Sequence, residues 1–332
     1  MREKEIVMDI IRLAEEIIGG KRITRGEDTE FFISADIKLL CEGADRIRKH
    51  FCGDHVDLCS IINGKSGKCS ENCRFCAQSA HNCTGVNEYP FLDTETILKE
   101  CKHNEAKGVH RFSIVTAGRT LSDSDFEKAV DAYSTLHEKA EMLLCGSHGL
   151  LTDEQFRRLR STGVNRYHCN IETSRRNFPN ICTTHTYDDK IACIKRAQNA
   201  GFEVCSGGII GMGETWEDRI DMAISLAELG VSSIPINALM PIKGTPLEKL
   251  DRLSEEDILR TVAIFRYIVP TAQIRLAAGR DLMTDCGKQA FLSGANSTIT
   301  GDMLTTSGND INGDVNMLSA MGFDIEKRNR NE

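Results

Sequence analysis

Three closely spaced cysteines are the residues of this sequence that point most directly to chemistry. They are Cys69, Cys73 and Cys76, in the run Cys-Ser-Glu-Asn-Cys-Arg-Phe-Cys, and they follow an apolar stretch that is typical of a β-strand. One loop with this spacing can offer three thiolates to one iron–sulfur cluster. Such clusters usually take four cysteine ligands, so a cubane on this loop would keep one iron without a protein ligand. The loop therefore predicts a [4Fe-4S] cluster with an open iron.

Two other interpretations of the same loop stay open at this point. Zinc sites typically pair cysteines a few residues apart and complete a tetrahedron with His or Cys, and His81 or Cys83 could supply that ligand. The cysteines could also be buried thiols with no ligand role. The wider spacing of the first cysteine pair favours iron over zinc.

The composition indicates a globular protein that acts on small molecules. The chain has 332 residues, 40% of them hydrophobic, and is long enough for one large α/β barrel or two smaller domains. Its net charge of -8 and the absence of a basic stripe argue against nucleic acid and membrane partners. No apolar run approaches the ~18 residues of a membrane span, and the start lacks a signal peptide's apolar core. We expect a cytoplasmic protein, in which 14 cysteines indicate metal or redox chemistry rather than disulfides.

Strand-like and helix-like segments alternate with a period of about 30 residues, which is typical of βα units. Eight such units would close into an α/β fold of the (β/α)8 TIM-barrel type, with chemistry at the C-terminal ends of the strands. Amphipathic helices are expected at Asp123 to Lys139, Tyr187 to Ala200 and Thr215 to Leu229. The expected strands are Val56 to Ile62, Arg111 to Thr116, Met142 to Gly146, Arg166 to Glu172, Phe202 to Ile210, Ser232 to Ala238, Ile274 to Ala278 and Leu292 to Ser297.

The chain is expected to have three consecutive parts. Residues 1–50 form a helical extension of two helices, residues 51–323 form the barrel, and residues 324–332 form a polar tail. Within the barrel, side-chain alternation along the fourth strand places Arg166, His168, Asn170 and Glu172 on one face. These polar residues should point inward and need a polar ligand, because leaving a buried polar group unpaired costs about 1–3 kcal/mol. Cys169 then points outward as a structural thiol.

The cysteine loop, with Phe75 before its third cysteine, resembles the loop of the radical S-adenosylmethionine (SAM) enzymes. Beyond the loop, the chain resembles the biotin synthase family over roughly residues 40–323. The resemblance implies an enzyme that inserts sulfur between two unactivated carbons of dethiobiotin, using a 5′-deoxyadenosyl radical. It is carried by the strings Val204 to Thr215, Pro235 to Asn237, Lys243 to Pro246, Arg275 to Arg280, Gly294 to Ser297 and Leu304 to Thr306.

The resemblance also implies roles for individual residues. Cys69, Cys73 and Cys76 would hold the [4Fe-4S] cluster, whose open iron binds SAM. Positions that match the family's cofactor site are Phe75, Asn170, Glu172, Lys190 and, in the glycine-rich segment, Gly207, Ile209, Gly211 and Glu214. Glu172 stands where the family has the shorter Asp. A tight strand-to-helix turn is the alternative for the glycine segment.

Two positions match the family's contacts with the substrate ureido ring, at His168 and Asn237. The family uses asparagine at both, so His168 is a departure, and a core histidine with satisfied hydrogen bonds is an equal alternative.

A second departure concerns the auxiliary cluster that supplies sulfur. The family's [2Fe-2S] cluster is held by three cysteines and an arginine, and Cys145, Cys205 and the catalytic Arg275 match three of these positions. The fourth position is Ser113, which offers no thiolate. Cys59, on the neighbouring first strand, lies in a layer with the other three because barrel interiors are built from alternate strands. We expect Cys59 to replace the lost ligand, with a four-iron form of the cluster as an option; a plain core thiol is the alternative.

Two other functions are weighed against this one. A different radical SAM enzyme, such as a hydrogenase-cofactor maturase or a carbon-skeleton mutase, would explain the missing thiolate at Ser113. A non-catalytic iron–sulfur carrier would have no use for Asn170 and Glu172. The family resemblance further implies a flavodoxin or ferredoxin as electron donor, iron–sulfur assembly proteins as partners, and a homodimer.

Overall fold

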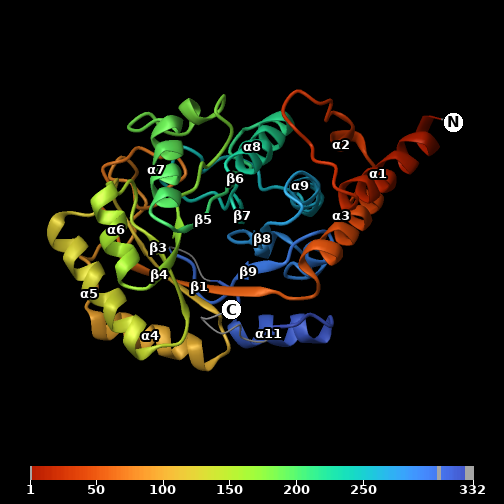
Figure 1. Ribbon diagram of the computed structural model, residues 1–332. Coiled ribbons are helices and arrows are strands. Elements are labelled where there is room, and N and C mark those ends of the chain that lie inside the picture. The colour runs from red at the N-terminus through yellow and green to blue at the C-terminus, as the bar shows by residue number, and fades with distance from the viewer. Residues whose placement is uncertain (1, 305–307, 326–332) are drawn as a thin grey trace.

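The structure is a computed structural model that describes residues 2–304 and 308–325, with side chains from Ile10 onward. Its centre is a closed barrel of parallel strands surrounded by helices (Figure 1). The strand order is β5-β4-β3-β2-β1-β9-β8-β7-β6, and pairing between β5 and β7 closes the ring. The strands are β1 Asp57–Lys65, β2 Arg111–Thr116, β3 Leu143–Ser147, β4 Val164–His168, β5 Glu203–Cys205, β6 Gly208–Ile210, β7 Ser233–Ala238, β8 Gln273–Leu276 and β9 Ser297–Ile299.

The helices lie outside this ring, and three of them precede it in the chain (Figure 1). Helices α6, α7, α8 and α9 begin with a capping box, in which Thr or Ser and an acidic or amide residue three positions later satisfy each other's backbone. The helices are α1 Arg2–Ile18, α2 Phe31–Ser34, α3 Ile37–Cys52, α4 Thr94–Ala106, α5 Asp123–Lys139, α6 Asp153–Ser161, α7 Tyr187–Asn199, α8 Trp216–Glu228, α9 Glu255–Ile268, α10 Lys288–Phe291 and α11 Ile311–Ala320.

The N-terminal helices cover one side of the barrel by packing on α9. Every residue of α9 from Ile258 to Ile268 is buried, because the helix lies between the strands and α3. The approach is close at Gly43, where a Cβ would lie 1.8 Å from the Tyr267 hydroxyl oxygen. That hydroxyl donates to the carbonyl of Ile10, 3.1 Å away, and so joins α9 to α1.

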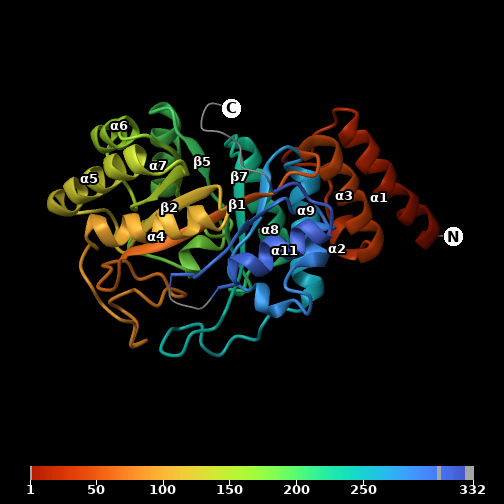
Figure 2. The same cartoon turned by 90° about the horizontal axis from the view of Figure 1, so that it is seen from below.

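Long connections after β1 and β7 project from the same end of the barrel (Figure 2). They touch each other, since the Cys83 amide donates to the Gly244 carbonyl over 3.1 Å. This end carries the C-terminal ends of the strands, where barrel enzymes place their chemistry. The loop after β1 is the cysteine loop.

The predicted (β/α)8 fold class is confirmed, and three strand predictions need correction. The fourth strand ends at His168 rather than at Glu172, whose backbone is left-handed. The stretch from Leu292 to Asn296 is not a strand; β9 begins only at Ser297, because the Asn296 side chain accepts from the Ile274 amide and from Arg266. The fifth strand is broken at Ser206 and Gly207, so the eight predicted strands appear as nine segments in the described residues. Of the predicted polar tail, residues 326–332 lie outside the described residues, as do Thr305 and Thr306 of the Leu304 string.

Candidate active site

A cavity of about 410 Å³ opens at the C-terminal end of the barrel. It receives side chains from the cysteine loop above and from the strands below. Most of the predicted site residues line it: Cys59, Cys69, Cys73, Phe75, Cys76, Ser113, Cys145, His168, Asn170, Glu172, Lys190, Cys205, Ile209, Asn237 and Arg275. Gly207, Gly211 and Glu214 lie outside the lining. The prediction that Arg166, His168, Asn170 and Glu172 share an inward face is confirmed, and Cys169 is buried on the other side.

The cysteine loop is fastened to the connection between β4 and α7. The Asn72 side chain accepts from the amides of Thr183 and Thr184, at 2.9 and 3.2 Å, and donates to the Thr183 hydroxyl at 2.7 Å. The Arg74 amide donates to the Ile181 carbonyl over 3.0 Å. Since these bonds hold the backbone between its cysteines, they fix where the three thiols meet the cavity.

Asn170, Glu172 and Lys190 form one polar group beside the loop. The Asn170 amide nitrogen donates to Glu172 over 3.3 Å, and Lys190 Nζ lies 3.9 Å from the other Glu172 oxygen. Burial by itself would lower the pKa of Lys190, but the negative charges of Cys169 and Glu172 outweigh it and raise that pKa. Glu172 has a left-handed backbone, φ 69°, which is rare for a residue with a side chain and typical of functional sites.

The glycine-rich segment is used mainly to build the strand. A Cβ at Gly207 would lie 2.0 Å from the Pro235 carbonyl oxygen, so only glycine fits at this break. The Glu214 carboxylate accepts from the amides of Gly211 and Met212, both at 2.7 Å, and pairs with Arg219. Glu214 thus closes the turn that starts α8. Its contacts are those of the tight strand-to-helix turn, the alternative to a cofactor-binding role.

Cys59, Cys145 and Cys205 meet at the floor of the cavity, on β1, β3 and β5. Burial and the neighbouring thiols Cys205 and Cys59 raise the pKa of Cys145 to about 12. Burial would also raise the pKa of Cys205, but its hydrogen bond to His168 and the charges of His168 and Arg275 lower it to about 6. Ser113 lies beside Cys145 in the β2–β3 register. The structure therefore places three thiols on one cavity floor without a cysteine at position 113.

A buried carboxylate under this floor was missed by sequence reasoning. Asp57 Oδ2 lies 2.6 Å from Arg275 Nη2, 3.4 Å from Arg166 Nη1 and 4.0 Å from Arg111 Nε. Burial would raise the pKa of Asp57, but Arg275 and the hydrogen bond to His110 hold it well below the usual range. The signal was present, because alternation places Asp57 on the same face of β1 as Cys59.

The two predicted substrate residues are both engaged within the protein. His168 faces Cys205 across the β4–β5 register; burial would lower its pKa, but the hydrogen bond to Cys205 raises it. The Asn237 amide donates to the Gly208 carbonyl at 3.1 Å and accepts from the Ala278 amide at 3.2 Å.

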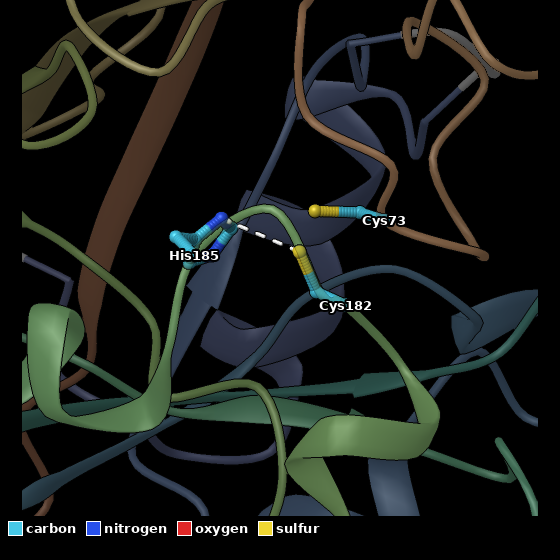
Figure 3. Close-up of side chains that lie close together, drawn as sticks. All are labelled: Cys73, Cys182 and His185. Atoms are coloured by element: carbon cyan, nitrogen blue, oxygen red, sulfur yellow. Dashed lines mark hydrogen bonds between the residues drawn. The ribbon is translucent and has the colours of Figure 1, made fainter.

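Neither residue of the zinc alternative completes a site with the loop. His81 Nε2 bonds the Ser70 carbonyl at 3.1 Å, and Cys83 is exposed. Within residues 10–304 and 308–325, the group of three or more metal-ligating side chains with mutually close ligand atoms is instead Cys73, Cys182 and His185 (Figure 3). Sequence reasoning passed over Cys182 and His185, because they lie far along the chain from the loop.

The donor set fits a cubane with SAM at its open iron. Three cavity-facing thiols adjoin a carboxylate and an ammonium group, at the end of the barrel where catalysis is expected. Residues 65–226 match the radical SAM superfamily, and residues 235–324 match the biotin and thiamin synthesis associated domain. Fold and site together define a radical SAM barrel enzyme.

Comparison with known proteins narrows this class. The chain is 65% identical over 314 residues to a biotin synthase of Clostridium beijerinckii, covering 95% of this chain and 99% of that protein. It is 64% identical to a biotin synthase of Alkaliphilus metalliredigens, covering 96% and 100%. The chain belongs to the biotin synthase family. It is a radical SAM enzyme that converts dethiobiotin to biotin with a [4Fe-4S] cluster, SAM, an auxiliary iron–sulfur cluster and an electron donor.

Two solved structures share the fold. Methylornithine synthase has a TM-score of 0.81 at 21% identity, covering 95% of this chain and 97% of that one. HydG, a maturase of the [FeFe]-hydrogenase, has a TM-score of 0.78 at 18% identity, covering 96% and 75%. At these identities the likeness concerns the fold alone and gives the maturase and mutase alternatives no further support. No helix in the described part of the chain is long and apolar enough to cross a membrane.

Proposed function

We propose that the reaction takes place in the single cavity between the cysteine loop and the barrel floor. The observation that carries this assignment is that one cavity holds two separate sets of three thiols. Cys69, Cys73 and Cys76 come from the loop, and the floor set comes from three alternate strands. A substrate between the two sets would lie within reach of both SAM and the sulfur donor.

Cys69, Cys73 and Cys76 would hold the [4Fe-4S] cluster, which when bound supplies the electron that cleaves SAM. Phe75, Asn170, Glu172 and Lys190 would hold SAM itself. The Lys190 ammonium is kept charged by Cys169 and Glu172 and offers a partner to the SAM carboxylate. Ile209 adds an apolar wall, while Gly207, Gly211 and Glu214 act indirectly, by shaping that wall.

At the floor, Cys59, Cys145 and Cys205 would hold the auxiliary cluster, which when bound supplies sulfur. Three thiolates add negative charge, and the Arg275, Arg166 and Arg111 guanidinium groups beneath them balance it. Arg275 Nη2 is already bonded to Asp57, so this arginine contributes charge and position more readily than a dedicated ligand atom. With three thiolates from this chain, a four-iron form is compatible with the floor. His168 and Asn237 would border the substrate.

The remaining assignments follow from the family. We propose a reduced flavodoxin or ferredoxin as electron donor, iron–sulfur assembly proteins that rebuild the auxiliary cluster, and a homodimer. The cytoplasm is the proposed location, because the 14 cysteines are all free and need a reducing compartment. Residues 1–50 would act as a packing extension to the barrel of residues 51–323.

The test is to reconstitute Cys59→Ala anaerobically with iron and sulfide. Its matched control is Cys101→Ala, a buried thiol on α4 that packs against Met142 and does not line the cavity. Iron and sulfide content, biotin and 5′-deoxyadenosine are then measured together. Cys59→Ala should lose the iron and sulfide of the auxiliary cluster and form no biotin, yet still release 5′-deoxyadenosine. The control should match the wild type.

A second variant tests the role of the loop thiols independently of the floor thiols. Cys69→Ala should lose 5′-deoxyadenosine formation while keeping the auxiliary cluster's iron. If Cys59→Ala instead retained full iron, sulfide and biotin formation, the floor assignment would be wrong and Cys59 would be a core thiol.

A further inference from the structure

A second set of potential metal ligands adjoins the cysteine loop and shares Cys73 with it. Cys182 Sγ lies 3.3 Å from His185 Nδ1, and Cys182 Sγ and a ring nitrogen of His185 lie within 4.8 Å of Cys73 Sγ. Figure 3 shows the Cys73 sulfur, from the loop, turned toward the Cys182 sulfur, from the connection that leads to α7. Cys182 and His185 do not line the active-site cavity, so the catalytic proposal leaves them without a role.

The separations are close to those of a tetrahedral metal site. Bond lengths of 2.3 Å to sulfur and about 2.05 Å to nitrogen correspond to ligand separations of about 3.6 Å for sulfur–nitrogen and about 3.8 Å for sulfur–sulfur pairs. The Cys182–His185 pair is near this value already. Cys73 needs to approach by no more than about an ångström, which a change of its side-chain torsion provides.

The His185 imidazole is held through contacts at one of its two ring nitrogens. His185 is buried, its Nδ1 faces Cys182 and the Glu71 carboxylate, and its Nε2 has no hydrogen-bond partner. Glu71 is itself buried and accepts from the Thr184 hydroxyl at 2.9 Å. Glu71 therefore borders the three donors and holds the imidazole at Nδ1. Arg119 Nη1, 3.8 Å from Glu71, offsets the negative charge beside the two thiols.

We infer that Cys73, Cys182 and His185 form a mononuclear site for a divalent transition ion of the zinc or ferrous-iron class. Two thiolates and an imidazole are the donors that such ions prefer. The site shares Cys73 with the loop, so, given the cubane proposed there, a single ion and the cubane exclude each other. The loop then has two metal-bound arrangements that differ in where one thiolate is directed.

The experiment is an anaerobic cobalt titration of the full-length, metal-free protein, followed by the visible bands of tetrahedral cobalt thiolate. The test variants are Cys182→Ser and His185→Gln, and the matched controls are Cys69→Ser and Cys76→Ser, which remove cubane ligands but not this site. Cobalt binding at this site should weaken at least tenfold in both test variants and stay unchanged in both controls. Far-UV circular dichroism of each variant should match that of the wild type, which shows that each variant is folded.

The opposite pattern would overturn the inference. If Cys182→Ser binds cobalt as tightly as the wild type, or if Cys76→Ser loses the same signal, the ion belongs to the cubane loop alone. Exclusivity is tested by reconstituting the [4Fe-4S] cluster first, which should abolish the Cys182-dependent cobalt signal; persistence of that signal would refute the shared Cys73.

A competition experiment then shows whether the site prefers zinc or ferrous iron. Zinc and ferrous iron, added separately, should each displace cobalt in the Cys76→Ser protein, and the ion that does so at lower concentration is the preferred one. Displacement by neither would refute the site. This outcome is independent of the Cys59→Ala test, which reads out iron and sulfide at the floor.

Discussion

Replacing Asp57 with asparagine removes the carboxylate that pairs with all three arginines of the barrel floor. Asp57 is 7% exposed in its side chain, and Arg275, Arg166 and Arg111 are 2%, 5% and 4% exposed. Asparagine keeps the shape of the side chain but not its charge. The substitution therefore leaves three buried guanidinium groups. Among the described residues, Glu203 is the carboxylate that still pairs with one of them, Arg166.

The size of the effect follows from this burial. Removing one partner of a buried ion pair costs about 3–5 kcal/mol, because the other charge stays desolvated. The matched control is Glu203→Gln, which breaks the 2.9 Å contact with Arg166 but is 51% exposed. Exposed pairs contribute about 0–1 kcal/mol. The free energy of unfolding should thus fall several times more for Asp57→Asn than for the control.

Anaerobic urea unfolding, followed by far-UV circular dichroism, measures both variants. The cost of Asp57→Asn should shrink when the auxiliary cluster is present, because its anionic ligand set also faces the arginines. The pH dependence has a defined sign. The folded pKa of Asp57 is held below the ordinary 3.8 by Arg275 and His110 against the effect of burial, so its stabilisation is present above that value and disappears as pH falls further.

A double substitution separates charge from packing. Arg166→Gln removes one of the uncompensated charges, so the combination with Asp57→Asn should cost less than the sum of the two single changes. Equal, small losses for Asp57→Asn and Glu203→Gln would refute the charge argument. Strict additivity in the double variant would refute the coupling.

Three further outcomes are expected. Lys190→Met should weaken SAM binding, measured by calorimetry on the cluster-loaded enzyme, by about tenfold through loss of a charged hydrogen bond, whereas Lys195→Met, on the exposed face of the same helix, should leave it unchanged. Gly207→Ala should destabilise the protein by about 3 kcal/mol or more in urea unfolding, since its Cβ would meet the Pro235 carbonyl at 2.0 Å. Burial lowers the pKa of His148 to about 3 from the ordinary 6.5. His148 should therefore add about 1.4 kcal/mol per pH unit to the rise of stability between these values, and His148→Gln should reduce the slope by that amount.

Local patterns predicted most of the barrel and the inward residues. Alternation along β4 placed Arg166 and His168 in the cavity because strand geometry decides which side chains share a face. Asn170 and Glu172, predicted on the same face, also line the cavity but follow the end of β4. The cysteine loop was found for a similar reason, since its three thiols lie within one short run. These features need no knowledge of which segments meet in space.

Long-range packing set the features that the sequence did not reveal. The break in the fifth strand depends on how closely Gly207 approaches Pro235, which belongs to another strand. The error at Leu292 has the same origin, because Asn296 bonds Arg266 on α9. Cys182 and His185 reach Cys73 only through the folded chain.

The hydrogen bonds that join Asn72 to Thr183 and Thr184 affect how the loop acquires its metal. Ordering a residue's backbone costs about 1–2 kcal/mol in conformational entropy. In zinc fingers that cost is met by the metal–ligand bonds, so folding and metal binding are one event. Here the hydrogen bonds of Asn72 and Arg74 are made within the protein and need no metal. Iron can therefore bind to a framework that is already ordered, and losing it need not unfold the loop.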